Sequence, residues 1–391
     1  MLNAADGKNK DGRAGRYVTQ ATGHRAFIPS PLPPVPDLKI DGELQRQLSN
    51  ADRALGRLDG SVHVLPNPDL FVYMYVRKEA VLSSQIEGTQ SSLQDLLSAE
   101  AETGTNTSSD VGEVVNYVRA MNRGLARLDT LPISVRLIRE IHEELLQGVR
   151  GSRLTPGELR RSQNWIGPAG SSLTNATFVP PPPEDVPPAL RALESFLHQQ
   201  DNVPLLVKIG LAHAQFETIH PFLDGNGRIG RLLVTFLLCE RGVLHKPVLY
   251  LSHYLKAHRQ EYYDRLQAVR DSGDWEGWLE FFLRGVADVS ANATETARRI
   301  LLLREDHREM IAKGLGRAAG NGHRILQHLY EHPIVSANQV QQLIETTYAA
   351  ANQIVGRLVG IGVLREITGN ARHRRFRYDP YVRLFDDGPD A

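Results

Sequence analysis

The chain has 391 residues, of which 41% are hydrophobic, and its 45 basic residues balance its 45 acidic ones. This length and apolar content support roughly two or three domains with sizeable cores, and they exclude a small disulfide-stapled scaffold. The zero formal charge excludes a global field that favours nucleic acid or membrane, so any such site must be local. The single cysteine, Cys239, lies in an apolar run and cannot form an internal disulfide, which indicates a reducing compartment.

The sequence contains no recognisable secretion signal or membrane anchor. Its first residues lack the apolar stretch of a signal peptide, and every apolar run is shorter than the roughly 20 residues of a membrane span. We therefore expect a cytoplasmic protein that makes no contact with a membrane.

Composition divides the chain into four regions. Residues 1–36 are polar and then proline-rich, which predicts an extended arm on the surface. Residues 37–112 repeat apolar positions at helical spacing, with one long or broken helix followed by a polar loop. Residues 113–313 continue the pattern and predict a helical core, interrupted over residues 158–187 by turn and extended signals that predict a short hairpin. The last two helices expected in this core cover residues 275–283 and 286–313.

Residues 320–391 form a last unit after a glycine-rich stretch. Two helices are expected over residues 336–344 and 348–358, and two strands over residues 363–367 and 374–378, so the unit resembles a winged helix. Between Arg357 and Tyr378 there are six arginines and one acid, a patch that can hold nucleic-acid phosphates. The alternative is a solvated face of a dimerisation or substrate-positioning module.

One loop between two expected helices concentrates chemically useful residues. Pro221 disfavours the α conformation at His220, so His220 is expected in the loop. Gly225 and Gly227 permit a tight turn whose N–H groups point outward at the start of the next helix, which creates an anion cradle. The remaining members are Asp224, a hard oxygen ligand suited to Mg²⁺, and Arg228 and Arg231, three residues apart on one helix face beside the cradle.

Each of these residues has an ordinary structural explanation when it is taken alone. His220 could cap a helix, the glycines could end one, and the arginines could form surface ion pairs. Jointly the segment places a titratable base, a carboxylate, an amide, two glycines and two arginines together, which is the inventory of a phosphate site.

The segment from His220 to Arg231 resembles the Fic (Fic/DOC) family motif, H-P-F-x-D/E-G-N-G-R-x-x-R, at every specified position. The resemblance implies a helical core that transfers AMP from ATP to a protein hydroxyl, with His220 as the general base and Asp224 as the Mg²⁺ ligand. It also implies nucleotide contacts by five residues: Gly225, Asn226 and Gly227 at the α- and β-phosphates, and Arg228 and Arg231 at the β- and γ-phosphates. Relatives that transfer phosphate have Ala and Lys where this chain has Gly225 and Gly227.

Two further segments are similar to parts of that family. The stretch 161–167 with Thr177, Phe178 and Val179 resembles its flap, a hairpin that pairs with the target peptide, and Phe178 is the expected clamp on the target. The alternative is a proline-terminated surface loop. Ser83 and Glu87, at i and i+4, resemble the inhibitory motif S/T-x-x-x-E-G/N, and we expect Glu87 to pair with Arg231. The alternative for Glu87 is a solvated helix charge.

The sequence thus predicts an all-α protein, with a Fic-type core, a small β-hairpin flap and a C-terminal winged helix. The predicted function is a protein adenylyltransferase that uses ATP and Mg²⁺ and is autoinhibited by Glu87. One alternative is a hydrolase that removes AMP from a modified protein and needs Glu87 to position water. Another is a nucleotide-sensing regulator that binds DNA through the last unit. The target protein, self-modification and a homodimer stay open.

Overall fold

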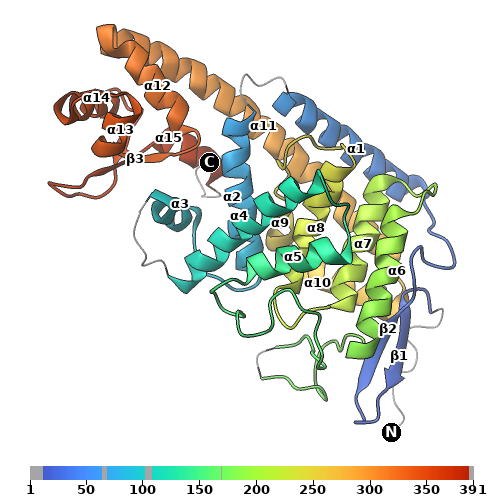
Figure 1. The fold of residues 1–391 in the computed structure, drawn as a ribbon. Coiled ribbons are helices and arrows are strands. Elements are labelled where there is room, and N and C mark those ends of the chain that lie inside the picture. Colours follow the sequence, from blue (N-terminus) through green and yellow to red (C-terminus); the bar gives the residue numbers. More distant parts are fainter. Residues whose placement is uncertain (1–11, 64–67, 102–107, 169, 387–391) are drawn as a thin grey trace.

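The computed structural model describes residues 12–63, 68–101, 108–168 and 170–386. The all-α prediction is confirmed, because helices form the body and the two small sheets lie at its ends (Figure 1). The first four helices form the N-terminal part: α1 (Gly42–His63), α2 (Asp69–Ile86), α3 (Leu93–Ala101) and α4 (Ser109–Leu128). The core then contains α5 (Val135–Leu145), η1 (Pro183–Asp185), α6 (Val186–His198), α7 (Leu205–Ile219), α8 (Asn226–Glu240), α9 (Ser252–Ala257), α10 (Arg259–Ser272) and α11 (Trp275–Leu315).

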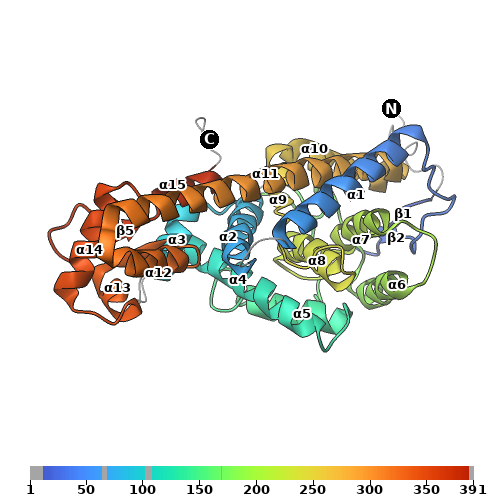
Figure 2. The ribbon, with the colours of Figure 1, turned by 90° about the horizontal axis from the view of Figure 1, so that it is seen from above.

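Helices α7 and α8 lie at the centre of the body (Figure 2). Almost every residue of both is buried, in keeping with sequences that are apolar on nearly all faces. The loop that joins them, residues 220–225, is the predicted motif. The core therefore holds this loop between its two most buried helices.

Helix α11 is a single helix of 41 residues, where the sequence predicted two. Gly285 lies at the expected break but does not end the helix. The ring of Tyr254 packs against it, where a Cβ atom would be only 2.6 Å away, so the position requires a glycine for packing. At 1.5 Å per residue, α11 is about 60 Å long. It runs beside α1 and continues to the C-terminal unit (Figure 2).

The N-terminal arm contains a hairpin that the sequence analysis missed. Strand β1 (Gly15–Thr19) pairs with β2 (Arg25–Pro29) in an antiparallel register, with Tyr17 opposite Phe27. Arg13 fixes the hairpin to the start of α11 by a bidentate contact with Glu276, at 2.8 and 2.9 Å. The sequence analysis expected extended backbone in this arm, and it did not predict that residues 15–19 and 25–29 pair as strands.

The region predicted as one long or broken helix is two helices, and the break lies at Glu87. Helix α2 ends at Ile86, Gly88 adopts φ +101°, and α3 begins at Leu93. The predicted hairpin over residues 158–187 is reduced to one bridge, between Ile166 and Phe178. Prolines from Pro180 onward lack the N–H groups that would extend the pairing.

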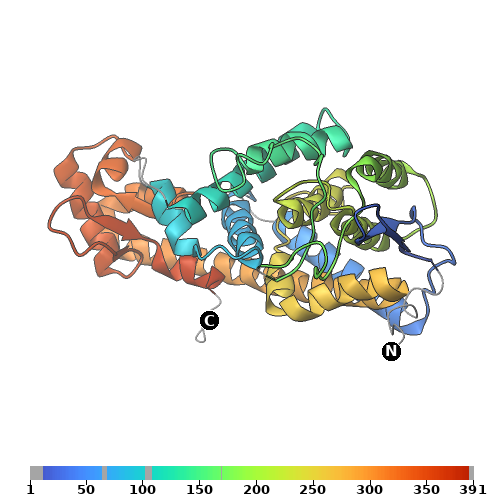
Figure 3. The same cartoon turned by 90° about the horizontal axis from the view of Figure 1, so that it is seen from below.

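The C-terminal unit follows α11 through η2 (Gly316–Ala318). Its elements are α12 (Ala319–Leu329), β3 (Ile334–Ser336), α13 (Ala337–Leu343), α14 (Tyr348–Gly360), β4 (Arg365–Glu366), β5 (Arg375–Arg377), α15 (Asp379–Val382) and η3 (Arg383–Phe385). The three strands form one sheet in the order β3-β5-β4, so a third strand joins the two expected ones. The winged-helix interpretation stays a prediction, which this order supports. Figure 3 shows the unit beside α3, away from α6 and α7.

Most arginines of the basic patch already have partners within the protein. Arg365 and Arg377 pair with Asp379, and Arg357 donates to the Gly314 carbonyl at 2.7 Å. Arg375 donates to the Ala101 carbonyl, also at 2.7 Å, and so ties the unit to α3. In the part of the chain that the structure describes, no helix combines the length and apolarity needed to cross a bilayer.

Candidate functional site

His220 ends α7 and opens the motif loop. It adopts a left-handed conformation, φ 48° and ψ 61°, which is unusual for a residue with a side chain. Arg160 Nε donates to its carbonyl oxygen at 2.9 Å, and Asn164 Nδ2 donates to the Phe222 carbonyl at 2.9 Å. The start of the flap segment therefore holds His220 out of the helix, as its position before Pro221 predicts.

The imidazole of His220 is kept neutral by its surroundings. Its pKa is lowered to about 4, mainly by burial and also by the nearby Arg270 and Arg160 guanidinium groups, whose effect exceeds the opposite effect of Glu87. Nδ1 makes no hydrogen bond within the described residues. A partly buried, neutral imidazole whose Nδ1 is buried and unsatisfied is suited to accept a proton from a hydroxyl group.

The rest of the loop is fixed by its own side chains. Gly225 adopts φ +77° and directly precedes α8, as the tight turn requires. Asn226 Oδ1 accepts from Phe222 N at 2.8 Å, while its Nδ2 donates to the Phe222 carbonyl at 2.9 Å. The Asn226 amide therefore closes the loop on itself, and in this structure it is not directed at a phosphate. Asp224 Oδ1 accepts from Gly225 N at 2.7 Å.

His142, on α5, supports the loop and was missed by the sequence analysis. Its Nδ1 accepts from Gly157 N at 2.8 Å, so Nε2 carries the proton and donates to the Asp224 carbonyl at 3.0 Å. Its ring stacks on Phe222, with centroids 3.7 Å apart. Burial lowers the pKa of His142 to about 4, which preserves this tautomer. A lone histidine on a helix gives no sequence signal for this role.

Arg231 lies beneath the cradle and is held by α2. Its Nη2 donates to Glu87 Oε1 at 2.8 Å and to the Ser83 carbonyl at 3.0 Å, while its Nε donates to Ser83 Oγ at 2.8 Å. The predicted Glu87–Arg231 ion pair is confirmed. Burial raises the pKa of Glu87, but Arg231 more than offsets this, so the pKa lies below its ordinary value and the carboxylate is charged.

The Glu87 carboxylate occupies the cradle itself. A methyl group on Gly227 would overlap Glu87 Oε1, so this oxygen lies directly against the first turn of α8. The N-terminus of a helix beside an arginine favours any anion. The Glu87 carboxylate is therefore the anion that this helix start holds in the structure.

Arg228 is buried and is bound to α4. It forms an ion pair with Glu113 of α4 at 3.0 Å, and both side chains are 1% exposed. Its Nη2 also lies 3.5 Å from Asp224 Oδ1. Arg228 therefore links α4 to the carboxylate of the loop, and the expected phosphate contact would require its release from Glu113, a residue the sequence analysis did not single out.

The flap differs from expectation in which side it exposes. Phe178 is 2% exposed, lies beneath the Arg270 guanidinium at 3.9 Å and contacts Phe27 of β2. Its expected role as a target clamp stays a prediction, and this burial counts against it. Phe27 N also donates to the Val179 carbonyl, so β2 lies along the outer edge of the flap strand that contains Thr177 and Val179. Trp165, on the other strand, is 42% exposed, and its backbone has no partner among the described residues.

Family models match two consecutive parts of the chain. The Fic/DOC family N-terminal model matches residues 45–126, and the Fic/DOC family model matches residues 132–238, which include the motif loop. These two regions of the chain are Fic/DOC family domains. The first match covers the helices that present Ser83 and Glu87, and the second covers the helices that present His220 and Arg231.

The Fic chain is similar to curated relatives over part of its length. It is 30% identical over 196 residues to a probable protein adenylyltransferase from Aquifex aeolicus, covering 49% of this chain and 56% of the relative. It is 35% identical over 160 residues to the protein adenylyltransferase Fic of Aedes aegypti, covering 40% of this chain and 28% of the relative. The chain thus spans about half the length of the first relative and about a quarter of the length of the second.

Solved structures share the fold of this Fic chain. A Fic family protein from Desulfovibrio desulfuricans G20 superposes with a TM-score of 0.57 at 18% identity, covering 87% of this chain and 97% of that one. A Fic domain containing signaling protein from Bacteroides thetaiotaomicron VPI-5482 gives a TM-score of 0.50 at 19% identity, covering 66% and 97%.

Asp224 is the candidate metal ligand of the Fic loop. Its side chain is 29% exposed, and only Oδ1 is engaged, by Gly225 N and Arg228. One carboxylate suits Mg²⁺, which binds through one or two carboxylates and otherwise through phosphates and water. The described residues contain no group of three His, Cys, Asp or Glu side chains that could hold a metal alone.

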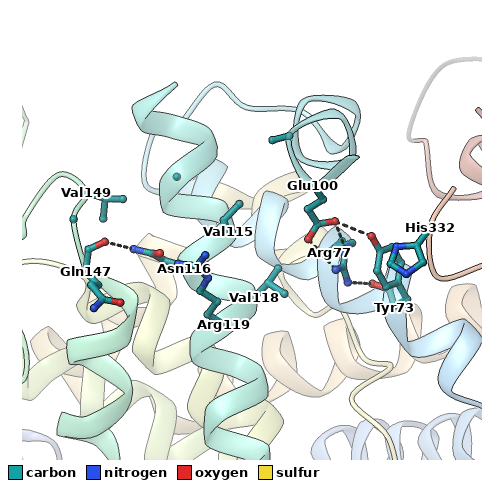
Figure 4. A pocket seen from close by; sticks show the side chains of 13 residues that line it. Tyr73, Arg77, Glu100, Val115, Asn116, Val118, Arg119, Gln147, Val149 and His332 are labelled. Atoms are coloured by element: carbon teal, nitrogen blue, oxygen red, sulfur yellow. Dashed lines mark hydrogen bonds and ion pairs between the residues drawn. The ribbon is translucent and has the colours of Figure 1, made fainter. Parts of the chain in front are cut away.

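A separate cavity of about 610 Å³ lies between α2, α4 and the C-terminal unit (Figure 4). Its polar side chains mostly bind one another: Glu100 accepts from Arg77 and Tyr73, and Asn116 donates to the Gln147 carbonyl. The cavity does not reach His220, so we assign it no part in the chemistry.

Proposed function

We propose that this chain is a protein adenylyltransferase, which transfers AMP from ATP to a hydroxyl group of a target protein. The observation that carries the proposal is a neutral, partly buried His220 at the end of α7, next to an anion cradle formed by Gly227 and Arg231. The names of the curated relatives support the same activity.

The residues have distinct tasks in this reaction. His220 accepts the proton of the target hydroxyl, whose oxygen attacks the α-phosphorus, while the bond to the departing pyrophosphate breaks. Arg231 and the N–H groups at the start of α8 bind the phosphates and hold the triphosphate in line. Asp224 would hold Mg²⁺, which neutralises phosphate charge when it is bound.

We infer that the target adds to the flap along the strand of Trp165. The opposite edge is engaged by Phe27 N, whereas the Trp165 backbone groups are free among the described residues. Backbone pairing fixes an extended target segment without requiring one sequence, and the exposed indole supplies an apolar contact. This replaces Phe178 as the target contact.

Glu87 inhibits the proposed reaction by occupying the cradle. An arginine held by a carboxylate and by Ser83 has few donors left for a γ-phosphate, so a triphosphate cannot be oriented for in-line attack. The hydrolase alternative needs a free Glu87 carboxylate to position water, and here Arg231 engages that carboxylate. The partners of the C-terminal arginines account for much of the basic patch, and we propose no DNA-binding role.

Radioactive ATP added to a cell lysate tests the activity. With Glu87→Gly enzyme, ATP labelled at the α-phosphate should label protein bands, whereas ATP labelled at the γ-phosphate should not. Glu87→Gly/His220→Ala is the matched control, because it keeps the open cradle and lacks the base. Label from the γ-phosphate, or equal α-label with the control, would contradict AMP transfer by this site. A band at the mass of the enzyme itself identifies self-modification.

A further inference from the structure

A buried acid next to the cradle has no part in the mechanism above. Glu217, in the last turn of α7, is 6% exposed, and its Oε1 has no hydrogen-bond partner among the described residues. A methyl group on Gly230 would lie 2.6 Å from that oxygen, so the carboxyl group lies against α8, one residue before Arg231. A buried carboxyl group without donors is unfavourable when charged, unless a cation lies close to it.

Titratable groups face Glu217 from each helix packed around it. Burial raises its pKa to about 7, Arg231 and Arg270 lower it, and Glu87 raises it. On the same side, Tyr262 of α10 binds His213 of α7, whose pKa burial lowers to about 4. Glu87 and Glu217 thus lie against Gly227 and Gly230 of the same helix, on which Arg231 follows, and only Glu87 is within hydrogen-bond distance of Arg231. Arg270, whose Nη2 donates to the Glu217 carbonyl at 3.3 Å, is the second guanidinium close to Glu217.

We propose that Glu217 is a second counter-ion for Arg231. Glu217 is neutral while Glu87 or a nucleotide phosphate binds Arg231, and it is ionised when neither is bound to Arg231. A buried guanidinium without a counter-charge is strongly unfavourable, and a second carboxylate beside an already paired guanidinium is also unfavourable. When Glu87 leaves, Glu217 releases its proton to solvent and pairs with Arg231. When a phosphate arrives, Glu217 takes one proton back.

This assignment makes Glu217 a positioning residue and couples nucleotide binding to proton uptake. It rests on the proposed nucleotide site. Because the complex binds one more proton than the free open enzyme, the Kd for nucleotide should rise as the pH rises, by up to about tenfold per pH unit. A residue that only fills space between α7 and α8 would produce no such coupling.

Calorimetry with α,β-methylene-ATP and Mg²⁺ tests the coupling, because this analogue binds but cannot transfer AMP. Glu87→Gly enzyme is compared with Glu87→Gly/Glu217→Gln in phosphate and Tris buffers, whose different ionisation enthalpies report protons taken up. We expect the enzyme that retains Glu217 to take up as much as one more proton per site than the double variant, and only the former to show a pH-dependent Kd. Equal proton uptake by both enzymes overturns the assignment.

The outcomes separate this inference from the proposed function. If Glu87→Gly does not bind the analogue, the nucleotide site itself is wrong, and the inference falls with it. If the Glu217→Gln variant does not fold, infrared difference spectra of Glu87→Gly decide the matter. Analogue binding should then produce the carbonyl band of a protonated carboxylic acid, and its absence contradicts the proposal.

Discussion

His220 is the side chain on which the proposed chemistry depends. Removing a general base typically lowers a rate by about 10²- to 10⁴-fold, so His220→Ala should reduce AMP transfer by this factor. Because the cradle belongs to α8, the variant should still bind ATP. Rates of α-phosphate labelling and a calorimetric titration measure the two effects. Undiminished labelling would contradict the role of His220.

The lowered pKa of His220 predicts the pH range of activity. With a pKa of about 4, the imidazole stays in its neutral, proton-accepting form as the pH falls from 8 to 6. An ordinary histidine, with a pKa of about 6.5, would lose most of that form over the same range. Transfer by Glu87→Gly enzyme at saturating ATP should therefore change little between pH 8 and pH 6. A fall centred near pH 6.5 would contradict this environment for His220.

The sequence predicted those site residues that are contiguous and missed those that converge from elsewhere. The motif from His220 to Arg231 could be recognised because one short stretch contains the base, the glycines and the cations. Glu113, His142 and Glu217 are single residues on other helices, and their spacing differs in no way from that of ordinary helix positions. Only the packing of α4, α5 and α7 around α8 gives them a role.

At the scale of elements, the inhibitory segment is the end of one helix. Glu87 is the C-cap of α2 and precedes Gly88, so Glu87→Gly removes the carboxylate without placing a glycine inside the helix. An inhibitory coupling of about 1 to 3 kcal/mol predicts that labelling rises roughly 5- to 150-fold. Autolabelling of wild type and variant at equal folded fraction measures the change. Arg231→Ala is the control, since it should be inactive with or without Glu87.

Two aromatic residues of the flap are expected to have different roles, Trp165 in target binding and Phe178 in stability. Trp165→Ala should raise the KM for the target several-fold with little change in KM for ATP, because the indole, which donates to the Ser171 carbonyl, takes no part in the cradle. Phe178→Ala should instead lower the free energy of unfolding by about 3 kcal/mol, because this ring is buried against Phe27. Leu302→Ala, exposed on distant α11, is the matched surface control. Equal target KM for Trp165→Ala and wild type would count against the assigned edge.

Elements were predictable where local pattern decides them. Helical periodicity predicted the helical core, but it could not show that Gly285 makes room for the ring of Tyr254 and does not mark a helix end. The arm was interpreted from its proline-rich run, whereas its strands end at Pro29, the first proline of that run, and are stabilised by tertiary contacts. These contacts include the Phe27–Val179 hydrogen bond and the Arg13–Glu276 pair, neither of which leaves a pattern in the sequence.

For the whole molecule, buried histidines predict loss of stability in acid. Burial lowers the pKa of His213 to about 4, below the value of about 6.5 in the unfolded chain. The unfolded state therefore binds more protons below pH 6.5, and stability that is complete above this pH is lost as the pH falls. Between pH 7 and pH 5 this single residue should cost about 2 kcal/mol.

Thermal unfolding of wild type and His213→Gln at the two pH values measures this contribution. The variant should lose less stability than wild type on acidification, because glutamine does not titrate. Glu217 and Glu79, whose pKa values burial raises to about 7, act in the opposite direction and are present in both proteins. If wild type and His213→Gln lose the same stability between pH 7 and pH 5, the interpretation of His213 as buried and neutral is contradicted.

Glu87 lies against Gly227 and binds Arg231, so under the proposed function the chain contains its own competitor for the nucleotide. A tethered competitor has an effective concentration fixed by the geometry of the chain, which dilution of the protein does not change. The apparent Kd for productive ATP binding therefore exceeds the intrinsic Kd by the reciprocal of the fraction of molecules in which Glu87 has left. Basal activity per molecule is then independent of the amount of enzyme and follows the ATP supply.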